Sequence, residues 1–298
     1  MIAETRYSKL TSLKIYKPQA LFELKTASNF TVQALTDIYN QTREDYIVPM
    51  PMNRAKMQEY ITCYDVDLTQ SVVVMADDRP LGLAMLGVRG DQTWITRLGV
   101  TPAGRQKGVG RGLMDGLLEN SRRLGSNRVI LEVIKNNTPA QQLFESYGFQ
   151  TTRELLVIRR PPAPTNMLAG HTLYIEVVGH QEALNLLKQR TDTPSWVTAN
   201  QSLAHVANLS ALVADIPGIG RGWLVYQSSL FQVTRLVLEL AVGASIDVAA
   251  SLLQHLHWRH SVQDTAVENL PIQNEMWPVF KRLGYLISFT RIEMVLEL

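Results

Sequence analysis

Apolar and polar positions alternate along the first half of the chain with two different periods. Segments with an apolar residue at every third or fourth position predict amphipathic helices. Short runs rich in valine, isoleucine and leucine, bounded by turn residues, predict strands. Their alternation predicts an α/β fold class, in the α+β form with a mixed sheet. The expected helices cover 29–40, 54–62, 109–124 and 138–147, and the expected strands cover 71–76, 81–88, 93–100, 128–134 and 149–158.

A proline-rich segment divides the chain. Residues 159–166 read Arg-Arg-Pro-Pro-Ala-Pro-Thr-Asn, and three prolines in four residues exclude a helix or a central strand. The charge changes sign here, because residues 1–160 carry a net charge of +5 and residues 161–298 carry −3. We therefore expect two domains, 1–160 and 161–298, and we expect an anionic ligand to prefer the first.

The second half repeats short sequences of the first. Trp94–Leu98 (Trp-Ile-Thr-Arg-Leu) is matched by Gln232–Leu236 (Gln-Val-Thr-Arg-Leu), and Phe144–Phe149 is matched by Phe280–Tyr285. The matches keep their order and nearly their spacing, which is typical of a duplicated domain. The two copies differ in the segment that connects the predicted strand to the predicted helix. The first copy has a basic, glycine-rich loop at 105–112, and the second has a shorter segment that carries an acid.

Three glycines at alternate positions, Gly108, Gly110 and Gly112, lie where a predicted strand gives way to a predicted helix. Glycine lets the backbone approach a ligand closely, and free N–H groups at a helix start favour phosphate. With three basic residues around it, the loop predicts a site for a phosphorylated cofactor. The dinucleotide pattern G-x-G-x-x-G fails because Leu113 replaces the third glycine, and the Gly-Lys-Ser/Thr of a P-loop is absent.

Two motifs resemble those of the GNAT superfamily of N-acetyltransferases. The family's acetyl-CoA motif is a strand that ends in apolar-x-Val-x-Pro, followed by a loop with the pattern Arg/Gln-x-x-Gly-x-Gly/Ala. In this chain the strand end reads Leu-Gly-Val-Thr-Pro at 98–102, and the loop reads Arg-Gln-Lys-Gly-Val-Gly at 105–110. The second motif, Asn-x-x-Ala-x-x-Leu-Tyr-Glu-x-x-Gly-Phe, is matched at 137–149, with Phe144 in place of the tyrosine. The second half matches only as a degenerate copy, which resembles tandem GNAT proteins.

This resemblance implies acetyl-CoA as co-substrate and a binding site for it in the first half. One strand would pair with the pantetheine arm, the loop amides would hold the pyrophosphate, and two side chains would flank the thioester. The strand residues are Leu98, Gly99 and Val100, the loop residues are Arg105, Gln106, Lys107, Gly108, Val109, Gly110 and Arg111, and the flanking residues are Asn137 and Phe144.

Acetyl transfer to a primary amine needs a general base and is helped by a general acid. The resemblance implies Glu132 as the base, because family members that modify protein N-termini use a glutamate at this strand position. Phe144 cannot donate a proton, so we expect Tyr147, three residues on, to be an imperfect substitute acid. At pH 7, deprotonating a lysine-like amine costs about 4.6 kcal/mol and an α-amine only about 1 kcal/mol. We therefore expect a small-molecule or peptide acceptor with a low-pKa amine.

Composition narrows the function classes further. A net charge of +2 does not indicate a basic surface for binding nucleic acid, and no apolar stretch predicts a membrane-spanning helix. The single Cys63 excludes an internal disulfide, and the first 25 residues show no signal peptide, so we expect a cytoplasmic protein. His255, His257 and His260 lie near a predicted helix end, and we expect no metal there.

The sequence thus predicts an acetyl-CoA-dependent N-acetyltransferase with two tandem GNAT-like domains. The degenerate second copy would supply core, part of the acceptor cleft or the surface of a homodimer. Two alternatives stay open. A non-catalytic acyl-CoA sensor would explain Phe144, and a Rossmann-type oxidoreductase would bind NAD(P) and no CoA.

Overall fold

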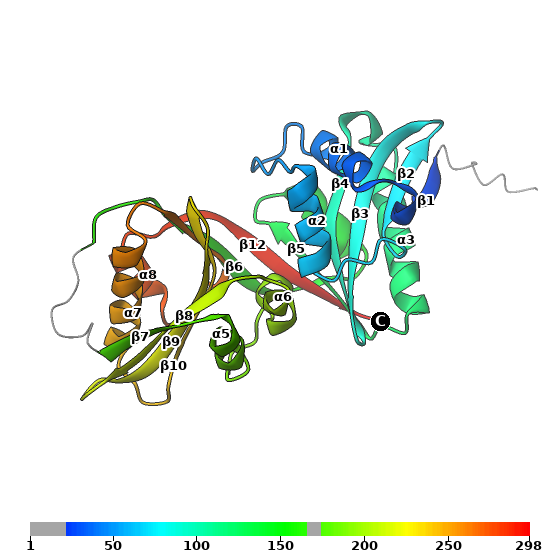
Figure 1. Ribbon diagram of the computed structural model, residues 1–298. Helices are drawn as coiled ribbons and strands as arrows, with labels where there is room; N and C mark the ends of the chain where they lie inside the picture. The colour runs from blue at the N-terminus through cyan, green and yellow to red at the C-terminus, as the bar shows by residue number, and fades with distance from the viewer. Residues whose placement is uncertain (1–21, 166–173) are drawn as a thin grey trace, which may run out of the picture.

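The computed structural model describes residues 22–165 and 174–298. Most of the first 25 residues, considered above for a signal peptide, lie outside these residues, as does Asn166 at the end of the proline-rich segment. Figure 1 shows the two halves of the chain as two bodies joined by long strands. These strands belong to one twelve-stranded sheet that runs through the described residues.

The first half follows the order that the sequence pattern predicts. Its strand β5 has the predicted bounds, and most other elements begin or end within two or three residues of the prediction. The side chains of Thr31 and Asn53 cap the first two helices, as short polar residues do. The elements are β1 (Glu23–Thr26), α1 (Val32–Thr42), α2 (Arg54–Cys63), β2 (Val72–Ala76), β3 (Arg79–Arg89), β4 (Gln92–Val100), α3 (Val109–Arg123), β5 (Arg128–Ile134), α4 (Thr138–Ser146) and β6 (Gln150–Arg160).

The second half repeats this order element by element, which confirms the duplication. The elements are β7 (Ile175–Val178), α5 (His180–Leu187), α6 (Asn200–Ala204), β8 (Leu209–Ile216), β9 (Gly220–Ser228), β10 (Gln232–Leu240), α7 (Ile246–Arg259), β11 (Asp264–Pro271), α8 (Trp277–Arg282) and β12 (Leu286–Glu297). The sequence predicts the linker from residue 159, but Arg159 and Arg160 extend β6, where they pair with Ala266 and Thr265 of β11.

The two halves exchange their last strands. The strand order around the junction is β5-β12-β6-β11, so β12 lies between two strands of the first half. Residues 287–298 follow the second half in the sequence but do not complete a separate second sheet, because β12 pairs with β5 from Arg291–Ile134 to Glu297–Arg128. Figure 1 accordingly places the C-terminus in the first body. The division at residue 160 stays a prediction, since the sheet is continuous across it.

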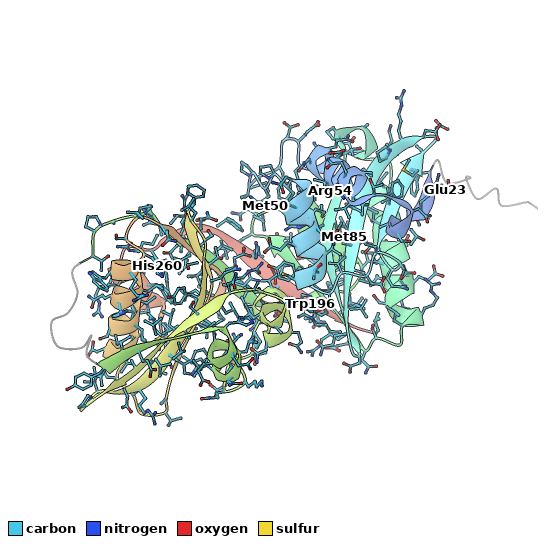
Figure 2. The ribbon with its side chains drawn as sticks, in the orientation of Figure 1. Glu23, Met50, Arg54, Met85, Trp196 and His260 are labelled. Carbon is cyan, nitrogen blue, oxygen red and sulfur yellow. The ribbon has the colours of Figure 1, made fainter. Side chains whose placement is uncertain are left out.

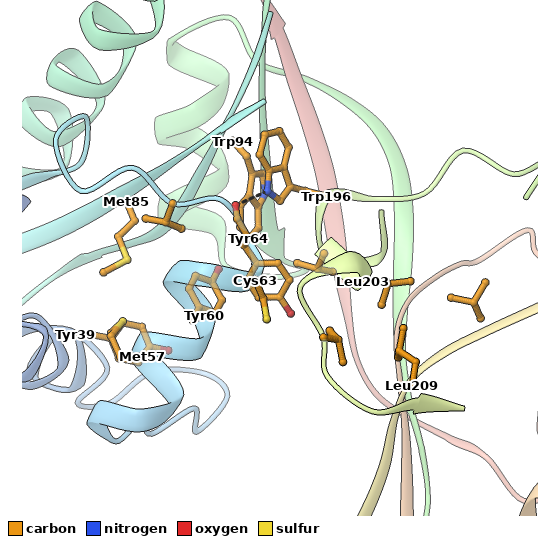
Figure 3. Packing of buried hydrophobic residues seen from close by; sticks show 14 of the residues in the cluster. Tyr39, Met57, Tyr60, Cys63, Tyr64, Met85, Trp94, Trp196, Leu203 and Leu209 are labelled. Carbon is orange, nitrogen blue, oxygen red and sulfur yellow. Dashed lines mark hydrogen bonds between the residues drawn. The ribbon is translucent and has the colours of Figure 1, made fainter. Parts of the chain in front are cut away.

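Helices cover both faces of the sheet. The first two helices of each half, α1, α2, α5 and α6, bury their apolar sides in one cluster that spans the two halves. In this cluster, Trp94 stacks on Trp196 with ring centroids 5.7 Å apart, and the Trp196 indole N–H donates to the Tyr64 carbonyl at 2.9 Å (Figure 3). The opposite face has separate clusters under α3 and α7. The junction is therefore a packed interior on one face.

Met294 offers a test of the exchanged strand. It lies on β12 near the C-terminus, is 1 % exposed, and packs in the cluster of the first half under α3. Met294→Ala is expected to lower the free energy of unfolding by about 2–5 kcal/mol, since it leaves a cavity in that core. Urea unfolding followed by tryptophan fluorescence measures the change. Leu286→Ala on the same strand removes a side chain that is 67 % exposed and is expected to have little effect. Equal effects would contradict the exchange.

Candidate active site

Strands β4 and β5 separate partway along their length. They pair in parallel from Gln92–Arg128 to Ile95–Leu131, and the pairing stops there although both strands continue. Beyond that point, among the described residues, β4 pairs as a strand only with β3, through Gly99 and Val100, so no strand covers its other edge. One group of this segment is occupied, because the Leu98 carbonyl accepts a hydrogen bond from Arg43 Nη2 at 3.3 Å. The backbone groups on this open edge have the spacing that an extended ligand needs to pair as an added strand.

The glycine-rich loop lies at the end of this opening. Gly108 is the residue before α3 and has a φ of 77°, a left-handed conformation that glycine adopts without strain. Within the described residues, the amides from Gln106 to Arg111 donate to no protein atom, and the first to do so is that of Gly112, to the Gly108 carbonyl at 3.0 Å. Free amides at a helix start attract phosphate. The loop therefore fits a pyrophosphate.

A cleft of about 1000 Å³ connects the strand opening with the second half. It is bounded by α2, β4, β5 and α4 of the first half and by β10, β11 and β12 of the second. Figure 2 places Met50, on the α1–α2 loop, and Trp196 at the junction of the two bodies. The residues predicted from the sequence that line the cleft are Leu98, Gly99, Val100, Arg105, Gly110, Glu132, Asn137 and Phe144.

The remaining predicted residues lie beside the cleft or away from it. Gln106, Lys107, Gly108 and Arg111 are exposed on the loop that bounds it, and Val109 is buried in the core under α3. Their contribution to cofactor binding stays a prediction, and the free amides of this loop are consistent with it.

Glu132 is a buried carboxyl group whose side chain is 6 % exposed. Its Oε1 accepts a hydrogen bond from Asn269 Nδ2 at 2.7 Å, and its Oε2 lies 3.4 Å from Arg291 Nη1. Burial raises the pKa of Glu132 above its ordinary value, and Arg291 and Asn269 offset only part of that effect. A raised pKa suits a general base, which must take up a proton near neutral pH.

Arg291 of β12 joins two acids that are related by the repeat. Its Nη1 donates to Glu268 Oε2 at 3.1 Å and to Asn269 Oδ1 at 2.7 Å, in addition to Glu132. Glu268 follows Glu132 by 136 residues, the offset that relates Phe144 to Phe280. Desolvation raises the pKa of Glu268, but Arg291 and Arg235 outweigh it and hold the pKa below its ordinary value. The two acids therefore differ in basicity.

Sequence reasoning missed the partners of Glu132, and only one of them left a signal. The repeat offset points to Glu268 once the two copies are aligned. Asn269 and Arg291 have no such signal, because they reach Glu132 through the pairing of strands that are far apart in the sequence.

Tyr147 has other partners. Its hydroxyl donates to Asp115 Oδ1 at 2.6 Å and lies 3.1 Å from the Arg111 carbonyl, on the side of α4 that faces α3. Burial, together with the hydrogen bond to Asp115, raises the pKa of Tyr147 above its ordinary value. Tyr147 is not among the residues that line the cleft in the described part of the chain. Its role as a general acid stays a prediction that this geometry does not favour.

Tyr46 brings a hydroxyl into the cleft, which the ring of Phe144 lines without one. Both residues line the cleft, and the Tyr46 hydroxyl accepts a hydrogen bond from Asn137 Nδ2 at 3.4 Å. The guanidinium of Arg43 lies 4.2 Å from the centre of the Tyr46 ring and holds the ring in position. The Tyr46 proton stays free for another acceptor, because the oxygen is the acceptor in its bond to Asn137.

The corresponding opening in the second half is closed. Strands β10 and β11 also separate, after Val233–Thr265, but the segment 190–198 and α8 leave a space of only about 60 Å³ between them. The start of α7 is capped, because the Ser245 hydroxyl accepts from the Asp247 amide at 3.2 Å. The acid at Asp247 also repels an anion. Residues 174–298 thus lack the features that fit a pyrophosphate in the first half.

The histidines of α7 are placed without a metal-like geometry. His255 and His257 are buried, and His260 contacts Gln263 and Tyr226. Desolvation, Arg160 and His260 lower the pKa of His257 to about 3. Among residues 22–165 and 174–298, no group of three or more His, Cys, Asp or Glu side chains is arranged to hold a metal ion. In the same residues, no helix has the length and apolar character needed to cross a membrane.

Comparison with known proteins agrees with this geometry. Residues 32–149 match the model of the Acetyltransferase (GNAT) family. No curated protein matches the sequence. The match covers the strand opening, the glycine-rich loop, Glu132 and Asn137, so these residues form part of a GNAT acetyltransferase domain.

Solved structures match nearly the whole chain. A GCN5-related N-acetyltransferase from Sphaerobacter thermophilus is 16% identical, with a TM-score of 0.69, over 94% of this chain and 96% of that one. A tandem GNAT protein from the clavulanic acid biosynthesis pathway is 13% identical, with a TM-score of 0.67, over 93% and 98%. A putative acetyltransferase from Pyrococcus horikoshii is 15% identical, with a TM-score of 0.62, over 99% and 94%. The tandem GNAT fold is therefore confirmed.

Proposed function

We propose that this protein transfers an acetyl group from acetyl-CoA to a primary amine of a small molecule or peptide. The reason is that residues 32–149 form a GNAT acetyltransferase domain within a tandem GNAT fold. The observation that carries the proposal is the separation of β4 and β5, which opens from the glycine-rich loop into the cleft that holds Glu132. When bound, acetyl-CoA supplies an acyl group whose C–S bond is exchanged for a C–N bond with the amine.

The residues of the first half would hold the cofactor by complementary groups. The free amides from Gln106 to Arg111 suit the pyrophosphate, and the open edge of Leu98–Val100 suits the pantetheine arm. Arg105 is tied to the opposite loop, since its Nη2 donates to the Glu44 carbonyl at 3.0 Å. Asn137 and the ring of Phe144 would lie along the thioester end.

Two residues would move the protons. Glu132 takes the proton of the amine, directly or through a water molecule, because its raised pKa makes it the stronger base of the two related acids. Tyr46 gives its proton to the departing sulfur, and Asn137 holds its oxygen in place. A thiol has a pKa near 8.5, so the thiolate leaves readily and the acid contributes less than the base.

The alternative functions are not favoured. A Rossmann-type oxidoreductase requires an open parallel sheet, whereas only the β4–β5 and β10–β11 pairs are parallel among the strands described. A non-catalytic sensor would give no reason for a buried carboxylate with a raised pKa in a cleft that reaches the cofactor loop.

Release of free thiol from acetyl-CoA in the presence of amines tests the proposal. We expect turnover that depends on the amine and a product heavier by one acetyl group in mass spectrometry. Binding of acetyl-CoA without turnover on α-amino, ε-amino and polyamine acceptors would favour the sensor. No binding of acetyl-CoA would refute the proposal.

Tyr46→Phe tests the acid. The substitution keeps the ring beside Arg43 and removes only the proton that we assign to the leaving sulfur. We expect kcat to fall about tenfold with little change in KM for acetyl-CoA, a smaller loss than the usual effect of a general acid because a thiolate leaves readily. Tyr147→Phe is the matched control and is expected to keep kcat. The reverse order of effects would restore Tyr147 as the acid.

A further inference from the structure

Two arginines occupy the same position in the two repeats and the same unusual backbone conformation. Arg97 on β4 has a φ of 52°, and Arg235 on β10 has a φ of 56°. The pairing register of each strand shifts at this point. The β3–β4 pairing shifts between Met85–Thr96 and Leu83–Gly99, and the β9–β10 pairing shifts between Thr234 and Val237. A non-glycine residue in the left-handed region is strained, and such strain gathers at functional sites. The bulges redirect both side chains.

Both guanidinium groups lie on tyrosine rings at one end of α2. Arg97 lies 3.9 Å from the centre of the Tyr60 ring, and Arg235 lies 5.3 Å from the centre of the Tyr64 ring. The two rings are themselves only 4.7 Å apart, and Figure 3 shows them side by side. All four residues line the cleft. The repeat thus brings Arg97 of the first half and Arg235 of the second half to one wall of the cleft.

Arg97 has no acidic partner. Its Nη1 donates to the Tyr39 hydroxyl at 3.1 Å, and its Nε is buried without a hydrogen-bond partner. In the described part of the chain, no carboxylate lies within 4.0 Å of this guanidinium. A partly buried charge without an opposite charge is costly, so such a group is normally paired. Arg291 in the same cleft shows the contrast, since it contacts Glu132 and Glu268.

Arg235 is only weakly neutralised. Its hydroxyl partner is Tyr64, and its acidic partner Glu59 lies 3.5 Å away with a side chain that is 57% exposed. Glu268 also acts on Arg235 from beyond 4.0 Å, but its close partner is Arg291. Among the described residues of this wall, Arg97 is therefore the arginine with no carboxylate within 4.0 Å. A carboxylate carries one negative charge and matches the planar fork of an arginine, whereas a phosphate monoester carries about −1.5 to −2. The charge balance favours a carboxylate.

We propose that the acceptor is an amine that also carries a carboxylate, an amino acid or short peptide, and that Arg97 binds this carboxylate with Arg235 as the second contact. The inference rests on the proposed function and names the substrate class of the same cleft. Arg97 and Glu132 lie just beyond Ile95 and Leu131, the last paired residues of β4 and β5, and both line the cleft, so the anion site and the base lie on neighbouring strands at the same opening. An acceptor held at Arg97 by its carboxylate therefore has its amine within reach of Glu132.

The test compares matched acceptors. Common L-amino acids and dipeptides are each assayed with acetyl-CoA beside their carboxamides, which keep the shape and remove the negative charge. For the best acceptor, we expect kcat/KM for the acid to exceed that for the carboxamide by about 10- to 150-fold, the value of one charge-assisted contact. In Arg97→Gln this ratio is expected to fall below about threefold. Because the ratio is measured within one variant, a general loss of activity does not affect it.

Two further variants separate binding from folding. Arg97→Lys keeps the charge but loses the planar fork and is expected to retain part of the preference. Arg221→Gln removes an exposed arginine that pairs with Asp215 on β8 and is expected to keep the full ratio. If Arg97→Gln does not fold, the wild-type ratio alone decides. A wild-type ratio near one, or acetylation of no member of the panel, overturns the inference. Absence of acetyl-CoA binding overturns the proposed function instead.

Discussion

Replacing Glu132 by glutamine is expected to lower kcat by about 10²–10⁴-fold, the usual contribution of a general base. Glutamine keeps the shape of the side chain and an oxygen for Asn269 Nδ2, but it has no site for a proton. The wild-type enzyme is expected to lose activity as the pH falls through the pKa of Glu132, because the base must be ionised to act. Burial raises that pKa, so this acidic limb lies above the ordinary glutamate value. The limb is expected to disappear in the variant.

Glu268→Gln is the matched control, because it changes the acid related to Glu132 by the repeat. The charge of Glu268 contributes to the raised pKa of Glu132. Its removal is expected to keep the acidic limb and to move it to lower pH. The pH dependence of kcat for the two variants and the wild type gives the comparison. Loss of the limb in Glu268→Gln, with its retention in Glu132→Gln, would assign the base to the second half.

Gly110→Asp is expected to raise the KM for acetyl-CoA at least about a hundredfold. The substitution places a carboxylate in the first turn of α3, where the free amides and the helix dipole favour a phosphate. A Cβ at this position lies 3.3 Å from the flexible end of Leu143, so a small shift of the Leu143 side chain accommodates the substitution. Acetyl-CoA at a hundred times its Kd should stabilise the wild type by about 2.7 kcal/mol. The resulting shift in Tm is expected to be absent in Gly110→Asp.

Ser245→Asp is the control variant and adds an acid at the N-cap of α7. Ser245 is the residue before that helix and its side chain already caps it, a role that aspartate fills equally well. This variant is expected to keep the wild-type KM for acetyl-CoA and the shift in Tm. A weakened KM in Ser245→Asp, together with an unchanged Gly110→Asp, would mean that the cofactor binds in the second half.

Local signals predicted the first half well. The strand Arg128–Ile134 is a short apolar run between turn residues, and α4 begins at Thr138 with Pro139 in its first turn. Such features act within a few residues, so the sequence carries them directly. The glycine-rich loop was found for the same reason, since its glycines and basic residues lie within eight consecutive positions.

Contacts between distant residues could not be predicted in the same way. Whether residues 287–298 join the first or the second half depends on pairing with β5 across more than a hundred residues, and both positions satisfy the apolar pattern. The environment of Glu132 depends on Asn269 and Arg291 for the same reason. The duplicated Thr-Arg-Leu sequence was visible, but only the fold brings Arg97 and Arg235 to neighbouring rings.

Calorimetric titration of the wild-type protein with acetyl-CoA measures how many cofactor sites each chain has. One opening, between β4 and β5, ends at free amides, and its counterpart between β10 and β11 is filled and capped. We therefore expect one binding site per chain. Two sites per chain would contradict the closed second half, and no binding would contradict the proposed function as a whole.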